Sequence, residues 1–506
     1  MYKVLRSDRD AYITNRVIKG TRTLSGNVGS AGTLDLYKLY GITLSGSTPN
    51  TELSRLLVHF DLQPLRDLVG SGDVDLSNNS FSCTLKLFDV YGGQPTPNNF
   101  TAAVFPLSRS FVEGLGRDVV YYSDNDVCNF LSGSRAQGAW LAQGCAFGGG
   151  LPGLVDYVTA STSINSGTSL AVTQSFVTGE ENLEVDVTLI VSATLAGLLP
   201  DEGFRISFND SIENDVRTYF VKRFASRTAY DESKRPKLII RYDDSIQDDN
   251  QQLFFDSSGS VFFYNYVHGA LANLTSGSSL VQITGSNSIT LKLETEVSGG
   301  WYTSTFTGSQ HRNGVNYVQG TYSASVYLSS TNPVFASKLL QSSSVTFVPI
   351  WGSLDGTVSF MTGTAITVQP PQRGHTQLNS QRFTVTAHCL SDCYDSNEKT
   401  VVRVHIFDAL SPKIKVSRLP IESAGLVIRD VHYQVRNNIT DVIEIPFDTQ
   451  KNSTRLSSDA SGMFFTLDVS NLTPNMTYVI DIMTSIGANK HIYKAASPSF
   501  RVNDVR

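Results

Sequence analysis

The chain has 506 residues, which exceeds a single hydrophobic core and, at about 150 residues per domain, indicates about three domains. Hydrophobic residues make up 40% of the sequence, which is enough for ordinary cores, so a mainly disordered protein is excluded. The net charge is −6 and Lys and Arg form no run, so a nucleic-acid partner is not expected.

Neither a signal peptide nor a membrane span is predicted. The first 15 residues carry five charged side chains and no apolar segment, so synthesis in the cytoplasm is expected. The longest apolar run, Val187–Pro200, is interrupted by Thr and Ser and falls short of the about 18 residues that span a bilayer.

The first strongly patterned segment is residues 55–62. Apolar side chains alternate there with Arg55, His59 and Asp61, and Leu57 is the one apolar residue on the polar side. Alternation with a period of two predicts a strand with one buried face. The next residues, Pro64–Val69, fit a turn and a half of helix.

Later segments repeat the same signals. Asp124–Leu131 is predicted to be a short helix, capped by Asp124 or Asp126. Leu183–Val191 and Leu238–Tyr242 alternate like the first strand, and clusters of Gly, Asn, Ser and Pro separate such segments. Short strands with this spacing predict an all-β protein: an N-terminal jelly roll or β-sandwich followed by two smaller β-sandwich domains.

Two polar segments mark the expected domain boundaries. The acidic stretch 243–250 has few strand-forming residues, and Pro370–Pro371 cannot donate to a β-ladder. We therefore expect domains at 1–243, 251–369 and 376–506.

The first domain resembles the DNRLRE family, a jelly roll similar to carbohydrate-binding modules. Five short motifs occur in the family's order over about 240 residues: Asp10-Ala11-Tyr12, Arg55 with Phe60-Asp61-Leu62, Asp186-Val187-Thr188, Gly203-Phe204, and Phe224-Ala225-Ser226 with Arg235-Pro236-Lys237-Leu238. Secreted bacterial members follow a signal peptide. This chain looks more like the versions in tailed-phage virion proteins, which have a stretch like 213–227.

The last domain is similar to fibronectin type III and immunoglobulin-like sandwiches. Leu472, Pro474 and Tyr478 have the spacing of a tyrosine corner, although Asn475 and Met476 replace the usual Gly and Thr. In that motif the Tyr hydroxyl bonds to upstream backbone.

Few residues suggest a ligand site. Tyr121, Tyr122 and Trp140 are the clustered aromatic residues that could stack on a glycan, and core packing explains them equally well. Asp124 and Asp126 offer oxygen ligands for calcium, but the Gly and further acidic residues of an EF-hand loop are missing. Arg55 and Asp61 could belong to a site, and cross-strand charge pairing at the sheet surface is the simpler reading.

The five cysteines are odd in number, which disfavours a secreted disulfide scaffold. Cys389 and Cys393 could form a loop disulfide or remain thiols, and a zinc site would need a second pair of ligands. Cys83, Cys128 and Cys145 are expected in cores.

No nucleophile elbow, P-loop or zinc-protease motif is present, so neither an enzyme nor a cofactor is predicted. The resemblance implies a structural protein of a tailed-phage virion, in the tail, baseplate or neck region. Its expected partners are other virion proteins and further copies of itself in a cyclic homo-oligomer. The alternative is an extracellular or cell-surface protein that binds carbohydrate, with a host glycan as partner.

Overall fold

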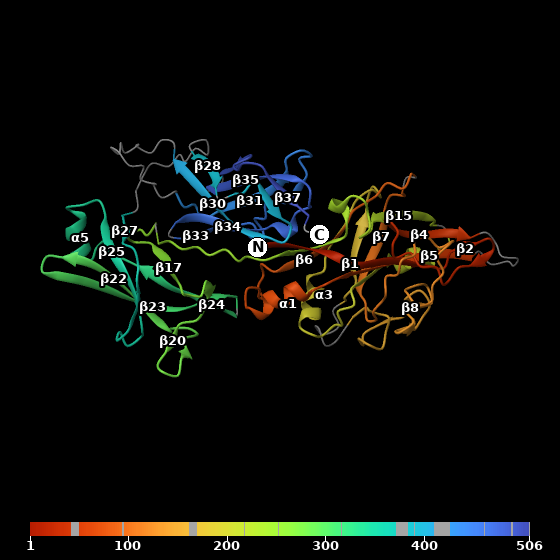
Figure 1. Cartoon of the computed structure of the whole chain (residues 1–506), viewed down its shortest axis with the longest axis horizontal. Helices are drawn as coiled ribbons and strands as arrows, with labels where there is room; N and C mark the ends of the chain where they lie inside the picture. The colour runs from red at the N-terminus through yellow and green to blue at the C-terminus, as the bar shows by residue number, and fades with distance from the viewer. Residues whose placement is uncertain are drawn as a thin grey trace. The chain divides into compact units, whose positions relative to one another are not determined.

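The computed structural model describes residues 1–41, 50–93, 96–160, 169–216, 218–250, 252–314, 316–370, 383–388, 390–408, 426–459, 461–486 and 489–504. Strands dominate it (Figure 1), so the all-β prediction is confirmed. The chain forms two compact units. The N-terminal unit comprises Lys3–Arg66 and Ser82–Ile240, and the C-terminal unit comprises Met1–Tyr2, Asp67–Phe81 and Arg241–Arg506.

The N-terminal unit is built on ten hydrogen-bonded strands. Eight follow the order β12-β7-β14-β5-β1-β16-β6-β13, and β4 joins β5 to β15. Their bounds are β1 Tyr2–Thr14, β4 Thr33–Gly41, β5 Asn50–Phe60, β6 Ser82–Leu87, β7 Phe100–Pro106, β12 Val172–Phe176, β13 Leu183–Asp186, β14 Phe204–Phe208, β15 Phe220–Ala225 and β16 Lys237–Arg241.

Strand β5 differs from its prediction because both of its faces are buried. Arg55 and His59 are each 7% exposed, and Leu57 is fully buried. Leu57 pairs in register with Ala11 of β1, and both pack against residues from the segment between β7 and β12. Leu57, the exception to the alternation, therefore marks the face that this segment covers.

The helix predictions have mixed outcomes. Helix α1, Gln63–Gly70, is confirmed. The predicted helix at Asp124–Leu131 is wrong, because Asp124 Oδ1 accepts the N–H of Asp126 (2.8 Å) and closes a turn instead. The predicted strand over Leu183–Val191 stops at Asp186, and helix α3 follows at Thr188–Leu195. Ile190, Val191 and Thr194 are buried on that helix, a spacing that helical periodicity also satisfies.

The C-terminal unit contains a seven-stranded sheet in the order β17-β24-β23-β22-β25-β26, with β27 also paired to β25. Its core gathers around Tyr322, Phe347 and Trp351. The bounds are β17 Ser258–Tyr264, β22 Ile289–Val297, β23 Gly300–Asn313, β24 Asn316–Tyr327, β25 Val345–Gly352, β26 Ser359–Thr362 and β27 Ile366–Val368.

Two further sheets of this unit form an immunoglobulin-like sandwich, in the orders β28-β30-β34-β33 and β29-β37-β35-β31-β32, with β36 on β35. The predicted tyrosine corner is present: the Tyr478 hydroxyl donates to Thr473 O at 2.7 Å. The bounds are β28 Phe383–His388, β29 Cys393–Asp395, β30 Lys399–Asp408, β31 Val431–Asn437, β32 Ile443–Ile445, β33 Ser457–Asp459, β34 Gly462–Asp468, β35 Thr477–Ile486, β36 Asn489–Tyr493 and β37 Phe500–Asn503.

The remaining elements are short. They are α4 Asp210–Asn214, α5 Pro333–Leu339, η1 Glu232–Lys234, η3 Val469–Asn471, and the two- or three-residue strands β2 Val17–Ile18, β3 Thr21–Arg22, β8 Ser132–Ser134, β9 Gly138–Ala139, β10 Gly148–Gly149, β11 Tyr157–Val158, β18 Tyr266–Val267, β19 Ala270–Leu271, β20 Thr275–Ser276 and β21 Val281–Gln282. None of the helices in the described residues has the length and apolar character needed to cross a bilayer. The expected boundary between 369 and 376 falls partly on 371–376, outside the described residues.

Candidate interaction surface

The segment that covers β5 is residues 107–160, here called the lobe. Its only strands in the structure are β8 to β11, each two or three residues long. The lobe contributes apolar residues to a buried cluster with β1 and β5. Its members are Leu107, Phe111, Cys128, Trp140 and Cys145 from the lobe, with Ala11, Ile13 and Leu57 from the strands.

Buried polar side chains replace the missing β-ladder inside the lobe. The Asp156 carboxylate is fully buried and accepts the backbone N–H groups of Leu141 (2.8 Å), Ala142 (3.1 Å) and Phe147 (3.1 Å). Asn129, also fully buried, accepts the N–H of Leu131 at 2.8 Å and donates to Asp124 O at 2.9 Å. Buried backbone groups need such partners, so these two side chains hold the lobe's backbone in one conformation.

Asn27 attaches the lobe from outside. Its Nδ2 donates to Glu113 O (2.8 Å) and Cys128 O (2.9 Å), and its Oδ1 accepts the N–H of Gly116 (2.7 Å). A Cβ atom on Gly116 would lie 2.0 Å from Asn27 O. Glycine is therefore required where the two backbones approach.

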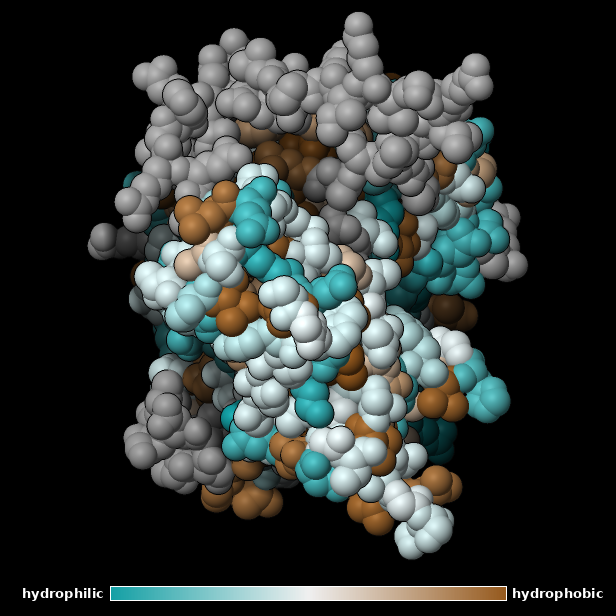
Figure 2. Space-filling view, turned by 90° about the vertical axis from the view of Figure 1, so that its left-hand side faces the viewer, coloured by the Kyte–Doolittle hydropathy of each residue, from teal (hydrophilic) through white to brown (hydrophobic). Residues whose placement is uncertain are grey.

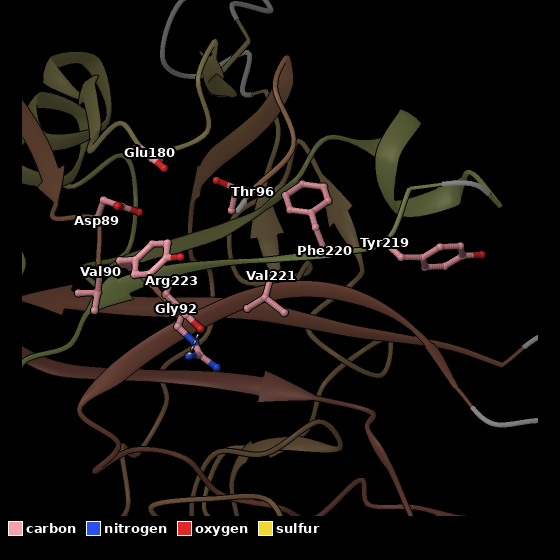
Figure 3. A pocket seen from close by; sticks show the side chains of 10 residues that line it. Asp89, Val90, Gly92, Thr96, Glu180, Tyr219, Phe220, Val221 and Arg223 are labelled. Atoms are coloured by element: carbon pink, nitrogen blue, oxygen red, sulfur yellow. Dashed lines mark hydrogen bonds between the residues drawn. The ribbon is translucent and has the colours of Figure 1, made fainter. Parts of the chain in front are cut away.

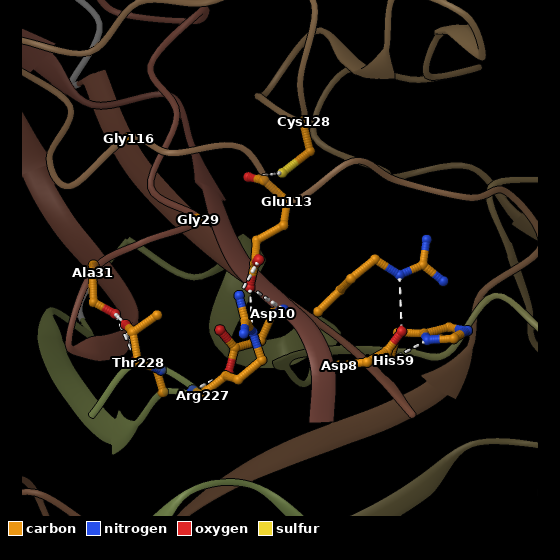
Figure 4. A network of polar contacts seen from close by, with 12 residues as sticks. Asp8, Asp10, Gly29, Ala31, His59, Glu113, Gly116, Cys128, Arg227 and Thr228 are labelled. Carbon is orange, nitrogen blue, oxygen red and sulfur yellow. Dashed lines mark hydrogen bonds and ion pairs between the residues drawn. The ribbon is translucent and has the colours of Figure 1, made fainter. Parts of the chain in front are cut away.

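A partly buried ion network ties the lobe to β1 (Figure 4). Arg227 donates from Nε and Nη2 to the two carboxylate oxygens of Glu113, at 3.0 and 2.5 Å. Asp10 lies beside this pair: its N–H donates to Glu113 Oε1 (3.0 Å), and its Oδ2 accepts the N–H of Arg227 (2.5 Å). Burial raises the pKa of Asp10 to about 7, and the nearby Glu113 charge adds to the shift.

Two buried arginines hold the opposite part of the lobe. Arg55 forms a bidentate ion pair with Glu213 of α4 (3.1 and 2.7 Å) and donates to Gly144 O at 2.7 Å. Arg205 donates to Cys145 O at 2.9 Å, and its guanidinium lies 4.2 Å from the centre of the Tyr157 ring. Asp61 instead accepts the N–H of Gln63 at the start of α1 (2.9 Å). The prediction that Arg55 lies at the sheet surface is therefore wrong, and Arg55 and Asp61 form no common site.

The outer side of the lobe is rich in exposed large hydrophobic residues. Four of them lie around the Asp156 anchor, which we call the apolar group: Leu141, Phe147, Leu151 and Leu154, 49–67% exposed. The N–H of Leu154 donates to Leu151 O at 3.2 Å, and that of Asp156 donates to Phe147 O at 2.8 Å. Five more exposed residues belong to the lobe: Val112, Leu115, Val120, Tyr121 and Tyr122.

The lobe also contains the residues predicted to form ligand sites. Tyr121 is 83% exposed and Tyr122 is also exposed, but Trp140 is only 5% exposed and donates from its indole N–H to Asn129 O (2.9 Å). Trp140 therefore supports the core and presents no face to a glycan. Asp124 closes the turn described above, and Asp126 lies 3.4 Å from Arg135. No group of three or more His, Cys, Asp or Glu side chains among the described residues could hold a metal ion.

The cysteines are arranged mainly as core residues. Cys83, Cys128 and Cys145 are buried thiols, and burial raises the pKa of each. Cys393 is an exposed thiol, whereas Cys389 lies outside the described residues.

No protein-family model and no curated protein matches the chain. Among solved structures, it is similar to the FN1–FN3 domains of chicken CNTN1, with 11% identity and a TM-score of 0.16, over 56% of this chain and 81% of that one. It is also similar to the N-terminal four Ig domains of Dscam1 isoform 9.44, with 8% identity and a TM-score of 0.13, over 54% of this chain and 59% of that one. TM-scores this low say nothing about function.

Proposed function

We propose that this chain is a structural component of a tailed-phage virion, in the tail, baseplate or neck region, and that it acts through protein–protein contacts. The observation that carries the contact role is the lobe, in which buried polar anchors fix a segment whose outer side exposes apolar residues. Exposed apolar clusters on a rigid support are typical of interaction sites. The tailed-phage assignment rests on the resemblance of the first domain.

The polar clusters of the lobe favour a structural role over catalysis. Asp10 is 1% exposed, and Glu113 has its carboxylate occupied by Arg227. Asp156 is fully buried and occupied by three N–H groups. A carboxylate that a substrate cannot reach is unsuited to acid–base chemistry, so these groups serve the fold.

We further propose that the apolar group lies at contacts between copies of the chain in a closed ring. In a closed ring, every interface joins the same two surface patches of neighbouring subunits, so one exposed apolar patch recurs at each interface. Exposed Leu and Phe side chains gain about 25 cal/mol for each Å2 of apolar surface that such a contact removes from water.

The experiment combines location with a matched pair of variants. Mass spectrometry and electron cryo-microscopy of purified virions should find the chain in the tail, baseplate or neck. Phe147→Ser with Leu154→Ser should lower the oligomer mass in native mass spectrometry while leaving the far-UV circular dichroism unchanged. The control is Leu340→Ser, since Leu340 is 89% exposed at the end of α5 in the C-terminal unit.

The side of the C-terminal unit that carries α5 suits the control substitution because its exposed hydrophobic side chains are dispersed. Seen from the side on which α5 and β22 are labelled in Figure 1, hydrophobic residues form small groups among polar ones (Figure 2). A chain absent from virions would refute the virion role. An oligomer that both variants weaken equally would refute the role of the lobe.

A further inference from the structure

A pocket of about 350 Å3 opens beside strand β15 in the N-terminal unit (Figure 3). The segment that follows β6 pairs with one half of this strand. The N–H of Val90 donates to Arg223 O at 3.1 Å, and the N–H of Ala225 donates to Phe88 O at 2.9 Å. Within the described ranges, no backbone hydrogen bond continues this pairing towards the start of β15, where Val221 lines the pocket. Part of one edge of β15 therefore faces the opening.

The register of β15 with β4 shows where the backbone groups of Val221 point. Val221 lies opposite Tyr37 of β4, two positions from the pair of Arg223 and Asp35. The Tyr37 N–H donates to Ser54 Oγ of β5 (2.7 Å), and Asp35 O accepts from the same hydroxyl (2.6 Å), so these groups face β5 and not β15. In an antiparallel pair, opposite residues exchange either two hydrogen bonds or none, and both backbone groups of a residue point to the same side. The N–H and C=O of Val221 therefore point away from β4, into the pocket.

These two groups form a short open strand edge. Val221 is only partly buried, and neither its N–H nor its C=O has a hydrogen-bond partner among the described residues. An open edge is a template for a further strand. One residue of an extended peptide offers a C=O and an N–H at the matching spacing, so this edge selects a peptide as ligand.

A buried lysine fixes the walls around this edge. Lys222 of β15 has a fully buried side chain whose ammonium group pairs with Asp89 and donates to Gly179 O (2.8 Å) and Glu181 O (2.9 Å). Its three N–H groups thus bind both the segment after β6 and the 179–181 loop. A pocket held this way keeps its shape without a ligand, which reduces the ordering cost of binding.

The loop that carries Glu180 is also held in place. The Glu181 carboxylate accepts the N–H groups of Val177, Thr178 and Gly179 at 2.7–2.9 Å. The Thr96 hydroxyl donates to Gly179 O at 2.7 Å. Glu180 is therefore presented to the pocket from a fixed backbone.

The opening carries a net negative charge. Arg223 pairs with Asp35 (3.1 Å), and the Lys222 ammonium group pairs with Asp89. Glu180 lines the pocket, is exposed, and has no ion-pair partner in the described part of the chain. A basic side chain therefore complements this opening, and an acidic one is disfavoured.

The exposed aromatic ring at the opening fits the same partner. The Tyr91 side chain lines the pocket and is 70% exposed. The face of such a ring attracts Lys and Arg side chains. We infer that an extended segment of another protein, carrying Lys or Arg, binds in this pocket and pairs with Val221 as an added strand. No lobe residue lines the pocket, so this contact is additional to the one proposed for the apolar group.

The test uses the full-length chain and a library of random dodecapeptides. The selected peptides should be enriched in Lys or Arg, and fluorescence polarisation measures the affinity of the best one. Amide hydrogen exchange then locates it. Binding should slow exchange at Val221 about tenfold or more, whereas the N–H of Lys222, which faces β4, should change little.

Two substitutions at Val221 separate its backbone from its side chain. Val221→Pro removes the N–H and should weaken peptide binding about tenfold or more. Proline is tolerated at a strand edge whose N–H makes no ladder bond, so far-UV circular dichroism should not change. Val221→Thr is the matched control, because it keeps the N–H and a β-branched side chain, and its affinity should equal that of the wild type. Glu180→Lys should weaken binding, since it reverses the charge at the opening.

The outcomes separate this inference from the virion role. A basic peptide that slows exchange at Val221 and binds Val221→Thr better than folded Val221→Pro supports the added strand, whether or not the chain occurs in virions. If Val221→Pro does not fold, the exchange measurement on the wild type decides. Failure to select any peptide, a preference for acidic peptides, unchanged exchange at Val221, or equal affinities of the folded Pro and Thr variants would each overturn it.

Discussion

The lobe and the immunoglobulin-like sandwich satisfy their backbones mainly in different ways, although Asp448 in a loop of the sandwich also accepts three backbone N–H groups. In the sandwich, ladders such as β31 with β35 pair seven residues in continuous register, and the tyrosine corner adds one side-chain bond. In the lobe, single side chains take over this role: Asn129 binds four backbone groups and Asp156 three, and Asn27, which attaches the lobe from outside, binds four. The stabilising hydrogen bonds are therefore spread over many backbone pairs in the sandwich and depend on a few side chains in the lobe.

This contrast predicts where single substitutions matter. Removing one ladder residue leaves most of a strand's hydrogen bonds intact, whereas removing one lobe anchor leaves several buried N–H groups without an acceptor. A surface built on concentrated anchors keeps a fixed shape despite its lack of long strands. It is also more vulnerable to mutation than the sandwich.

The largest effect is expected from Asp156→Ala. Three backbone N–H groups lose their acceptor and Arg109 loses its nearby buried carboxylate, so the N-terminal unit should lose about 3–5 kcal/mol of unfolding free energy. Chemical denaturation measures the loss, and hydrogen exchange at Leu141 and Phe147 localises it. Asp124→Ala is the control, since Asp124 closes only a local exposed turn. Equal losses in the two variants would contradict the anchoring role.

The next effect concerns Asp10 and depends on pH. Its folded pKa, about 7, lies above the ordinary 3.8, so its stabilising contribution is complete below about pH 4 and is lost as the pH rises through 7. Asp10→Asn stays neutral, so its stability relative to the wild type should increase by about 4 kcal/mol between pH 4 and pH 8. Denaturation midpoints across that range measure the difference.

Asp8 provides the control of opposite sign. Burial alone would raise its pKa, but the hydrogen bond and charge of His59, with the charge of Arg9, hold the pKa below its ordinary value. Its contribution is present above about pH 4 and is lost as the pH falls through the lower folded pKa. Asp8→Asn should therefore lose stability relative to the wild type as the pH rises to neutrality. The same trend in both variants would argue against the buried position of Asp10.

A smaller effect is expected in the sandwich. Tyr478→Phe removes the bond to Thr473 O and should cost about 1 kcal/mol, because the ladder around it remains. Tyr327→Phe, at a side chain 56% exposed in the same unit, should be neutral. Denaturation of the C-terminal unit compares them, and a loss as large as that of Asp156→Ala would remove the contrast between the two regions.

The smallest effect on stability is expected at the apolar group. Leu154 is 67% exposed, so Leu154→Ser should change the unfolding free energy by less than about 0.5 kcal/mol. Thermal denaturation of the N-terminal unit tests this. A large loss would mean that Leu154 supports the lobe instead of serving a partner.

Residue patterns within short segments predicted those parts of the fold that neighbouring residues determine. Alternating residues gave the strands, and the spacing from Leu472 to Tyr478 gave the corner. The helix Thr188–Leu195 was missed because the apolar residues Leu189 and Val191 continue the alternation of the preceding strand, whereas the residues that the helix buries include Ile190, Val191 and Thr194. The lobe was missed because its order comes from residues far apart in sequence, as between Asn27 and Cys128. The isolated Leu57 was the one local sign of it.

The pocket beside β15, lined among others by Asp89, Glu180 and Arg223, illustrates the same limit (Figure 3). These residues are unremarkable in the sequence, and contacts between distant segments, such as those of the buried Lys222 with Asp89 and Glu181 O, bring them together. Residue type alone does not predict a fully buried lysine, because lysine is rarely buried in proteins. The sequence singled out Tyr121 and Trp140 because they lie close together along the chain. Only the three-dimensional structure shows that Tyr121 is exposed and Trp140 is buried.

The two cysteines of the lobe give the N-terminal unit an internal reporter. Cys128 and Cys145 are buried beneath the lobe, so a thiol reagent such as dithionitrobenzoate can reach them only when the lobe detaches from β1 and β5. Cys393 is exposed and should react at once. In a Cys83→Ser variant, which lacks the third buried thiol of this unit, the slow phase of labelling would measure how often this surface opens, and a bound neighbour that covers the lobe should lengthen it.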